Sequence, residues 1–414
     1  MRGKPRRGRA VAPPGDFFYS RDDEKARRQE LRGWDEHIRH YTWRAAVRLS
    51  AERAARNGDL FAAGLFAALS FLAAGGEGAV LPYIQWDVLA LLLALMLVLA
   101  GLRRMGAVEA ACLLALESCR TVRAAAFFFT AACFVSSMFI TNDAALLVFV
   151  PESILLLSRL GLKRYVPFVV VLETLAANLG SMLLPSGNPQ NLYLYFHYQM
   201  EFGEFLAVTA PLAAVSGLLL FLAARRLPSQ PIPPIRPPVL SLRGGKLLLY
   251  LFLFLLVGAV ILRLCPVYML AVLFAAVLLA DRSLFGRADW KLLFLFVCLF
   301  VGVGNLERQP FISELVRSGI SGWNLEAAVL LSQCISNVPA AVLLSGYTDD
   351  GAALVAGTNI GGLGTLIASM ASLISFRCYT AMEGHDTRGY LKLFTLWNLA
   401  FLAALYGAAR FLFL

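Results

Sequence analysis

Charged residues are scarce in this sequence. They make up 15% of its 414 residues, whereas hydrophobic residues make up 59%. Soluble domains carry about 25% charged residues, so this composition excludes an ordinary soluble protein and is typical of a polytopic membrane protein. A chain of this length has room for roughly ten membrane spans of about 20 residues each.

Catalytic and metal-binding motifs are also missing. The sequence contains no His-Glu-x-x-His, no Gly-x-x-x-x-Gly-Lys-Ser/Thr, no Gly-x-Ser-x-Gly and no Cys-x-x-Cys. Its seven cysteines form no close pairs and lie mostly in apolar runs, which favours buried thiols over disulfides or metal sites. We therefore predict that the chain is not an enzyme and carries no cofactor. The missing nucleotide-binding loop excludes a pump powered by its own ATP hydrolysis.

The net charge of +10 is unevenly distributed. Residues 1–57 hold fifteen Lys or Arg but eight Asp or Glu. From Leu31, apolar residues recur at helical spacing with arginines between them, which predicts an amphipathic helix. Such a helix can lie on the anionic cytoplasmic membrane surface or pack against the rest of the chain. Aromatic residues are not interleaved with base-reading groups, so we expect no nucleic-acid partner.

Four short polar stretches interrupt the apolar sequence. They are 140–146 (ITNDAAL), 177–191, which holds ANLGS and PSGNPQN, 335–341 (ISNVPAA), and 358–372, which holds TNIGG and TLIASMAS. Unpaired backbone polar groups are costly in lipid, so irregular polar stretches at membrane depth persist where they line a cavity. The third and fourth stretches repeat the pattern of the first two in the same order. This repetition indicates a transporter built from two internal repeats.

Flanking basic residues indicate how these stretches enter the membrane. Arg120 and Arg123 flank the start of 122–158, and Arg159, Lys163 and Arg164 follow its end. Because basic loops stay in the cytoplasm, both ends of this segment lie on one side, which predicts a re-entrant hairpin. The segment 165–199 reads as a membrane helix broken between Asn178 and Asn191. In the second half, the matching hairpin is 323–346 and the matching broken helix is 351–376.

The predicted fold class is therefore an all-α polytopic membrane protein with inverted repeats, each containing a re-entrant helical hairpin and a broken transmembrane helix. The predicted domains are a basic cytoplasmic tail (1–57), a first transmembrane repeat (58–226), a Pro-rich cytoplasmic linker (227–245) and a second transmembrane repeat (246–414). We expect a multi-pass protein of the inner (cytoplasmic) membrane with a cytoplasmic N-terminus.

The combination of four stretches resembles the ion transporter superfamily. Within it, the chain is similar to the citrate-transporter-like and the arsenite-permease/sodium–proton-antiporter (ArsB/NhaD) families. The motifs that carry this similarity are NDAAL at the first tip, NLGS with GNPQN, SNVPA and NIGG. A more distant similarity links them to the divalent anion/sodium symporters, whose hairpin tips carry Ser-Asn-Thr where this chain has Thr141-Asn142-Asp143 and Ser336-Asn337-Val338. The resemblance covers about 60–412. It implies a homodimer with a fixed scaffold and a moving transport domain built from the hairpins and broken helices.

We predict that the four stretches form one binding site. An Asn side chain can bind a carboxylate or a cation without carrying charge itself. At a helix break, free N–H groups can face an anion and free carbonyls can hold a cation such as Na⁺. The predicted site residues are Thr141, Asn142, Asp143, Asn178, Gly180, Ser181, Asn188, Gln190, Asn191, Ser336, Asn337, Thr358, Asn359, Gly361, Ser369 and Ser372. Na⁺ is expected near Asn142, Asp143 and Asn178 and near Asn337 and Asn359.

Ionisable residues at membrane depth are candidates for ion coupling. Asp143 at the first tip can bind Na⁺ or carry a proton beside the substrate. Glu173, five residues before Asn178, is the other candidate proton carrier. Arg377 falls at the predicted end of the second broken helix, where we expect its side chain to reach the membrane interface.

These features predict a secondary active transporter of small anions, carboxylates or oxyanions, coupled to a cation and working by alternating access. Two alternatives are a Na⁺/H⁺ antiporter that uses Asp143 and an arsenite or antimonite efflux permease. An ion channel is the alternative from another class, because broken helices also build pores. The expected partners are a small anionic substrate, the lipid bilayer and a second copy of the chain.

Overall fold

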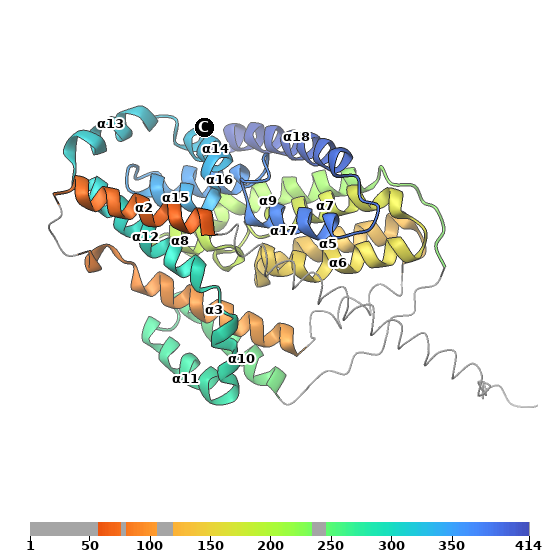
Figure 1. The fold of residues 1–414 in the computed structure, drawn as a ribbon, viewed down its shortest axis with the longest axis horizontal. Helices are drawn as coiled ribbons and strands as arrows, with labels where there is room; N and C mark the ends of the chain where they lie inside the picture. The colour runs from red at the N-terminus through yellow and green to blue at the C-terminus, as the bar shows by residue number, and fades with distance from the viewer. Residues whose placement is uncertain (1–56, 76–79, 106–118, 234–245, 414) are drawn as a thin grey trace, which may run out of the picture. The chain divides into compact units, whose positions relative to one another are not determined.

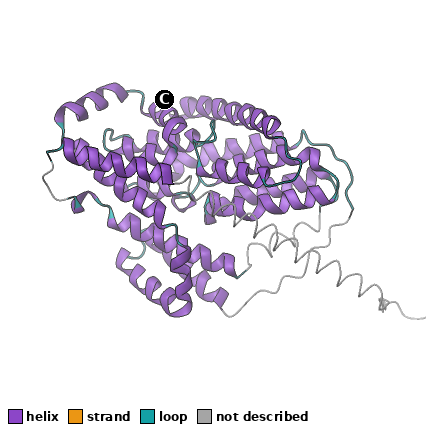
Figure 2. Cartoon of the chain, in the orientation of Figure 1, coloured by secondary structure: helices purple, strands orange, loops and turns teal. Residues whose placement is uncertain are grey.

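The computed structural model describes residues 57–75, 80–105, 119–233 and 246–413. Within these ranges the chain folds into helices joined by loops and turns, with no strand (Figure 2). The predicted tail up to residue 56 and the linker residues 234–245 lie outside the described ranges.

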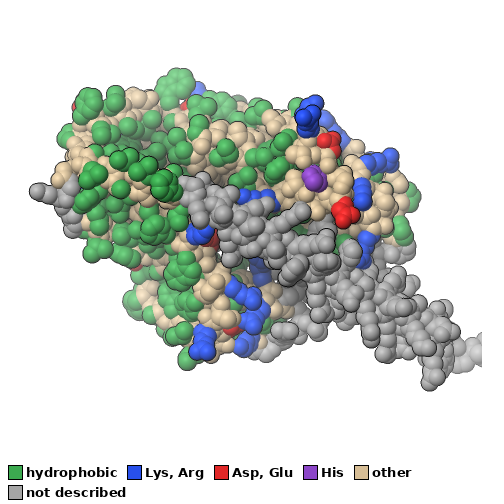
Figure 3. Space-filling model, viewed as in Figure 1, with side chains coloured by type: hydrophobic (Ala, Val, Ile, Leu, Met, Phe, Trp, Pro, Cys, Tyr) green, Lys and Arg blue, Asp and Glu red, His purple; other side chains and the backbone are tan. Residues whose placement is uncertain are grey.

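Six helices of the described ranges are long and apolar enough to cross a membrane. They are Trp86–Arg104 (α3), Val122–Ile140 (α5), Phe202–Ala224 (α9), Val267–Arg287, which contains α11 (Leu270–Asp281), Trp290–Glu307 (α12) and Thr387–Phe413 (α18). Large apolar side chains face outward on them and on neighbouring helices, and hydrophobic side chains cover much of the face in Figure 3. Leu279, for example, is 88% exposed. Apolar surface on this scale suits lipid, and the predicted class of all-α polytopic membrane protein is confirmed.

Each half of the chain contains a helical hairpin followed by a broken helix. The elements are α5 with α6 (Asn142–Arg159), then α7 (Val166–Gly180) with α8 (Pro189–His197), and in the second half α14 (Asn324–Ile335) with α15 (Asn337–Ser345), then α16 (Gly351–Gly361) with α17 (Met370–Thr380). Both breaks are eight residues long, 181–188 and 362–369. The remaining helices are α2 (Asn57–Ala73), α10 (Leu247–Ile261) and α13 (Pro310–Ile320).

The two hairpin tips have the same backbone conformation. Thr141 has φ 72° and ψ 149°, and Ser336 has φ 75° and ψ 155°. Positive φ is costly for residues other than glycine, so it persists where the surrounding structure requires it. Its presence at both tips shows that the repeat extends to single dihedral angles.

Polar residues at the ends of the breaks start the second arm of each broken helix. Asn188 accepts a hydrogen bond from the backbone N–H of Asn191 at 3.0 Å, and Ser369 accepts one from the N–H of Ala371 at 3.2 Å. Asn and Ser are favoured at this position because their oxygens satisfy N–H groups that have no partner within the helix. The sequence therefore sets where α8 and α17 begin.

Hydrogen bonds at the helix ends show that the hairpins open at opposite ends of the broken helix α7–α8. At the start of α7, Arg164 donates to the side chain of Gln230 at 3.1 Å, and the backbone N–H of Val122 donates to the carbonyl of Gln230 at 3.0 Å. Beyond the end of α8, the hydroxyl of Tyr198 donates to the carbonyl of Thr348 at 2.8 Å. Hairpin α5–α6 thus opens where α7 begins, and hairpin α14–α15 opens where α8 ends. Figure 1 shows α5, α6, α7, α9, α17 and α18 packed against one another.

The second broken helix continues further than its hydropathy predicts. The predicted boundary of 376 is too early, because α17 runs to Thr380 and includes Arg377. Hydropathy falls at Arg377, but a basic residue can remain inside a membrane helix when it faces a cavity instead of lipid. The lining of the second cavity described below contains this arginine.

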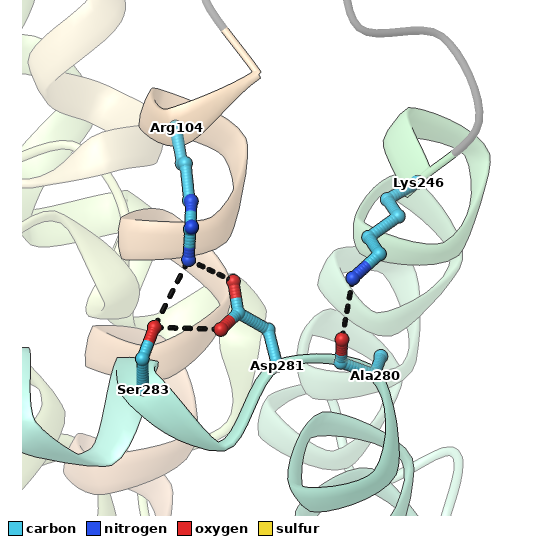
Figure 4. Close-up of polar contacts among 5 residues, drawn as sticks. All are labelled: Arg104, Lys246, Ala280, Asp281 and Ser283. Carbon is cyan, nitrogen blue, oxygen red and sulfur yellow. Dashed lines mark hydrogen bonds and ion pairs between the residues drawn. The ribbon is translucent and has the colours of Figure 1, made fainter.

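Helices α3, α10 and α11 form a neighbouring group with its own contacts. A Cβ on Gly101 of α3 would clash with the ring of Tyr250 on α10. Glycine at this position therefore lets α3 and α10 approach each other closely. At one end of the group Arg104 pairs with Asp281 and donates to Ser283 at 3.0 Å, while Lys246 donates to the carbonyl of Ala280 (Figure 4). These bonds join the ends of all three helices.

Candidate functional site

Residues from all four polar stretches line one cavity of about 100 Å³, the central cavity. Its lining includes Asn142 and Asp143 from the first tip and Asn337 and Val338 from the second. The broken helices contribute Pro189 and Gln190 at the start of α8 and Ser369 and Met370 at the start of α17, and α12 closes another side. The structure therefore brings together segments that lie about two hundred residues apart in the sequence.

The first residues of four helices meet at this cavity. Asn142 begins α6, Pro189 begins α8, Asn337 begins α15 and Met370 begins α17, and each lines the central cavity. A helix N-terminus carries a partial positive charge and N–H groups with no partner within the helix. Four of them around one cavity favour a negatively charged ligand.

A second cavity of about 270 Å³, the basic cavity, adjoins the first and shares Asn142, Asp143, Pro189, Asp289 and Leu292 with it. Its other lining residues include Arg103 at the end of α3 and Arg377 on α17. Across the two cavities the charged lining residues are Arg103, Arg287, Lys291 and Arg377, which are basic, and Asp143 and Asp289, which are acidic. Basic side chains thus exceed acidic ones by two, which again favours an anion.

A hydrogen-bonded group of side chains supports the first tip from behind. Asn142 donates to Oδ1 of Asn178 at 3.3 Å, and Ser369 donates to the same oxygen at 2.9 Å. Asn142 comes from the hairpin, Asn178 from α7 and Ser369 from the break before α17. Asn178 therefore links the two repeats directly behind the cavity.

A second group of asparagines joins the two broken helices. Asn188 donates to Oδ1 of Asn359 at 3.1 Å, and Asn359 donates to Oδ1 of Asn191 at 2.6 Å. All three side chains are at most 3% exposed. Buried amides need such partners, because an unsatisfied donor or acceptor costs roughly 1–3 kcal/mol.

The predicted site residues fall into distinct structural positions. Thr141, Asn142, Asp143, Asn188, Gln190, Asn337 and Ser369 line the cavities. Asn178, Ser181, Asn191 and Asn359 lie behind them in the hydrogen-bonded groups, and Ser336 donates to the carbonyl of Ala368 at 3.4 Å. Thr358 donates within its own helix to the carbonyl of Leu354, and Ser372 is buried with no hydrogen-bond partner for its hydroxyl among the described residues.

Sequence reasoning missed several charged residues of the lining. These residues lie at or beside helix ends, where a charged residue reads as an ordinary membrane flank. They are Arg103, Arg287, Asp289 and Lys291. Arg377 was expected at the membrane interface, and the structure places it in the lining of the basic cavity instead. The local sequence carries no signal that separates these two environments, because only the tertiary packing brings α3 and α17 to the same cavity.

Comparisons with known proteins agree with this architecture. A family model described as citrate transporter matches residues 58–370, more than half of the chain. The chain belongs to the citrate transporter family. It is 32% identical over 307 residues to the inner membrane protein YbiR of Escherichia coli K12, covering 71% of this chain and 80% of that protein. It is 31% identical over 303 residues to the uncharacterized transporter MJ0456 of Methanocaldococcus jannaschii, covering 71% and 81%. Members of this family are transporters, and this chain is a multi-pass membrane transporter.

Two of the predicted site glycines have close packing neighbours. A Cβ on Gly180 would lie 2.0 Å from the carbonyl oxygen of Phe134 on α5, and a Cβ on Gly361 would lie 2.7 Å from Oγ of Ser332 on α14. In each case the glycine lets a broken helix approach the hairpin of its own repeat. Neither glycine lines the central or the basic cavity, so their close neighbours indicate a role in helix packing.

Replacement of Gly180 should therefore destabilise the protein. Gly180→Ala must push α7 away from the backbone of α5, and overpacking of this kind costs about 1–3 kcal/mol. We expect a lower melting temperature in detergent by intrinsic fluorescence. Gly258→Ala on α10 is the matched control, because its Cβ would meet nothing within 4 Å. Equal melting temperatures for both variants and the unmodified protein would contradict this packing role.

Proposed function

We propose that this family member is a secondary active transporter of small anions, either carboxylates or oxyanions, coupled to a cation. The observation that carries the proposal is the meeting of four helix N-termini at the central cavity. The excess of basic residues around the two cavities supports the same sign of ligand. The family to which the chain belongs, that of citrate transporters, points to carboxylates.

The proposed mechanism is alternating access by an elevator-like movement in a homodimer. The hairpins and broken helices would move together, because they share the hydrogen-bonded groups around Asn178 and Asn359. Helices α3, α10 and α11, joined at their ends by the Arg104–Asp281 pair, would belong to the fixed part. We place the protein in the inner membrane with its N-terminus in the cytoplasm, so that the basic cavity would open towards the cytoplasm.

A Na⁺/H⁺ antiporter is the second candidate function. It is favoured by the presence of two carboxylates, Asp143 and Asp289, in the lining of both cavities. Carboxylate and amide oxygens are ligands that Na⁺ can use, and a carboxylate can also exchange Na⁺ for a proton. Transport of an anion by the purified protein separates this candidate from the proposed function.

Removal of one cavity arginine should weaken anion transport. In proteoliposomes, Arg103→Gln is expected to raise the half-saturating concentration for citrate about tenfold, because a charge-assisted hydrogen bond contributes roughly 1.5–3 kcal/mol. Arg104→Gln is the matched control, since the neighbouring Arg104 pairs with Asp281 and does not line either cavity. It should leave the half-saturating concentration unchanged and cost at most about 1 kcal/mol of stability.

The same assay tests the proposed function itself. Saturable citrate counterflow is expected for a transporter, whereas a channel would conduct without counterflow. Counterflow of other di- and tricarboxylates and of oxyanions would define the substrate class. No counterflow with any anion, together with Na⁺-driven proton movement, would overturn the proposal in favour of the antiporter.

A further inference from the structure

Glu173 is a buried carboxyl group outside both cavity linings. It lies on α7, is 0% exposed, and has one oxygen, Oε2, 2.7 Å from the hydroxyl of Ser153 on α6. Its other oxygen, Oε1, is buried without a hydrogen-bond partner, and no cation pairs with Glu173 among the described residues. An ionised carboxylate in such surroundings is very costly, because no paired charge and at most one hydrogen bond, from Ser153, compensate for the lost water.

The hydroxyl of Ser153 shows which form of Glu173 fits this geometry. Its Oγ lies 2.7 Å from Oε2 of Glu173 and 3.0 Å from the carbonyl oxygen of Val150. A hydroxyl has one proton to donate, and neither a carbonyl nor an ionised carboxylate can donate one. Both contacts are hydrogen bonds at the same time when Glu173 carries a proton and donates it to Ser153, which then donates to Val150.

The titratable surroundings of Glu173 come from several elements. Tyr390 on α18 lies near Glu173, and Cys378 on α17 lies near Tyr390. The other titratable or charged residues on the elements packed against α7 are Arg123 and Cys133 on α5, Asp143, Glu152 and Arg159 on α6, Lys163, Arg164 and Tyr165 before α7, Glu204 on α9, Arg377 and Tyr379 on α17, and Arg388, Lys392, Tyr406 and Arg410 on α18. Among the described residues, Ser153 is the side chain that contacts the carboxyl group of Glu173 directly.

The two helices that carry this contact, α6 and α7, are also joined by the hydrogen bond behind the first tip. Asn142 and Ser153 lie on α6, and their partners Asn178 and Glu173 lie on α7. Between the two contacts α6 contains Pro151, which has no N–H to donate to the carbonyl of Leu147, a residue of the basic cavity lining. Helix α6 therefore lacks one backbone hydrogen bond between the tip and Ser153. Closure of the tip and burial of Glu173 both depend on the packing of α6 against α7.

We propose that Glu173 is a proton-binding site separate from the substrate cavities, and that it takes up a proton when the first hairpin closes against α7. This inference rests on the transport function proposed above. A carboxylate exposed by separation of α6 from α7 binds a proton from water, and closure buries the neutral acid. After the transport domain has moved to the other side of the membrane, α6 separates from α7 again and the carboxyl group releases its proton to water. The closed, loaded state then carries the proton with the substrate, so proton and anion move in the same direction.

Infrared difference spectroscopy tests the proton site without any transported substrate. The full-length protein in lipid nanodiscs should show the deuterium-sensitive carbonyl band of a protonated carboxylic acid near neutral pH. We expect this band to be lost in Glu173→Gln and kept in Glu152→Gln, its matched neighbour on α6. Ser153→Ala keeps the carboxyl group but removes its partner, so it should shift the band even where Glu173→Gln fails to fold. An unchanged band in Glu173→Gln, or an unshifted one in Ser153→Ala, would overturn the proposal.

A transport assay then tests coupling, with citrate as the probe. In proteoliposomes, Glu173→Gln should retain citrate counterflow, which needs no net proton movement, and lose all additional uptake driven by an inward proton gradient. Gradient-driven uptake equal to that of the unmodified protein would overturn the coupling role. If the unmodified protein shows no counterflow with citrate, the failure concerns the proposed function, while the infrared band still decides whether Glu173 binds a proton.

Discussion

Asn142→Ala and Asn337→Ala are each expected to abolish anion uptake while leaving the fold nearly intact. Both side chains line the central cavity from opposite hairpins, and both are nearly buried, at 7% and 5% exposure. Loss of a donor and an acceptor to the ligand, at about 1–1.5 kcal/mol each, should weaken binding by roughly 30- to 150-fold, which leaves almost no uptake at a fixed substrate concentration. Because Asn178 keeps its bond from Ser369, removal of Asn142 leaves no acceptor unsatisfied behind the tip.

The measurement is citrate uptake into proteoliposomes that contain equal amounts of folded protein. Asn305→Ala is a suitable control, because Asn305 is also buried, at 2% exposure, but bonds to Ser70 away from both cavities. It should lose a similar amount of stability and keep its uptake. Normal uptake in either tip variant would show that the two tips do not form one shared site.

Asp143→Asn should separate anion transport from its coupling to a cation. Asp143 lies in the first turn of α6 and lines both cavities, so its carboxylate is beside the proposed substrate site. A carboxylate repels an anion unless a cation lies between them. We expect the variant to retain citrate binding but to lose the stimulation of uptake by Na⁺.

The other candidate functions predict different results for the same variant. A Na⁺/H⁺ antiporter must alternate Na⁺ and a proton on Asp143, so the amide should eliminate exchange completely. In an arsenite or antimonite permease the substrate is a neutral acid near neutral pH, and an amide acceptor should retain part of the flux. The assay is flux of each substrate class from mildly acidic to mildly alkaline pH, with Asp87→Asn in the first turn of α3 as control. A variant identical to the unmodified protein under all conditions would reduce Asp143 to a structural role at the helix N-terminus.

Much of the architecture could be predicted from sequence because lipid imposes strict rules on the backbone. Polar stretches such as 140–146 and 335–341 cannot persist at membrane depth without a cavity, and the structure places residues of both in the central cavity. The first broken helix was expected to be interrupted between Asn178 and Asn191, and the structure has its break at 181–188. The predicted domain limits at 57 and 245 adjoin residues outside the described ranges and stay predictions.

Local patterns could not separate a cavity residue from its neighbours. Arg103 and Arg104 are adjacent at the end of α3, yet one lines the basic cavity and the other pairs with Asp281. Gly180 belongs to a stretch that reads as a binding motif, but its neighbour in the structure is the backbone of α5. These assignments depend on which helix faces which, and hydropathy does not report that because lipid and a packed helix are equally apolar partners.

The sequence by itself determined the membrane class, the repeated pair of polar stretches and the tip asparagines, since each follows from the cost of exposing polar groups to lipid. Only the tertiary structure decided that four helix N-termini share one cavity, that arginines from α3 and α17 line its neighbour, and that Glu173 meets Ser153. The physical reason is that backbone cost acts on every residue locally, whereas charge and hydrogen-bond partners depend on contacts between segments far apart in the chain.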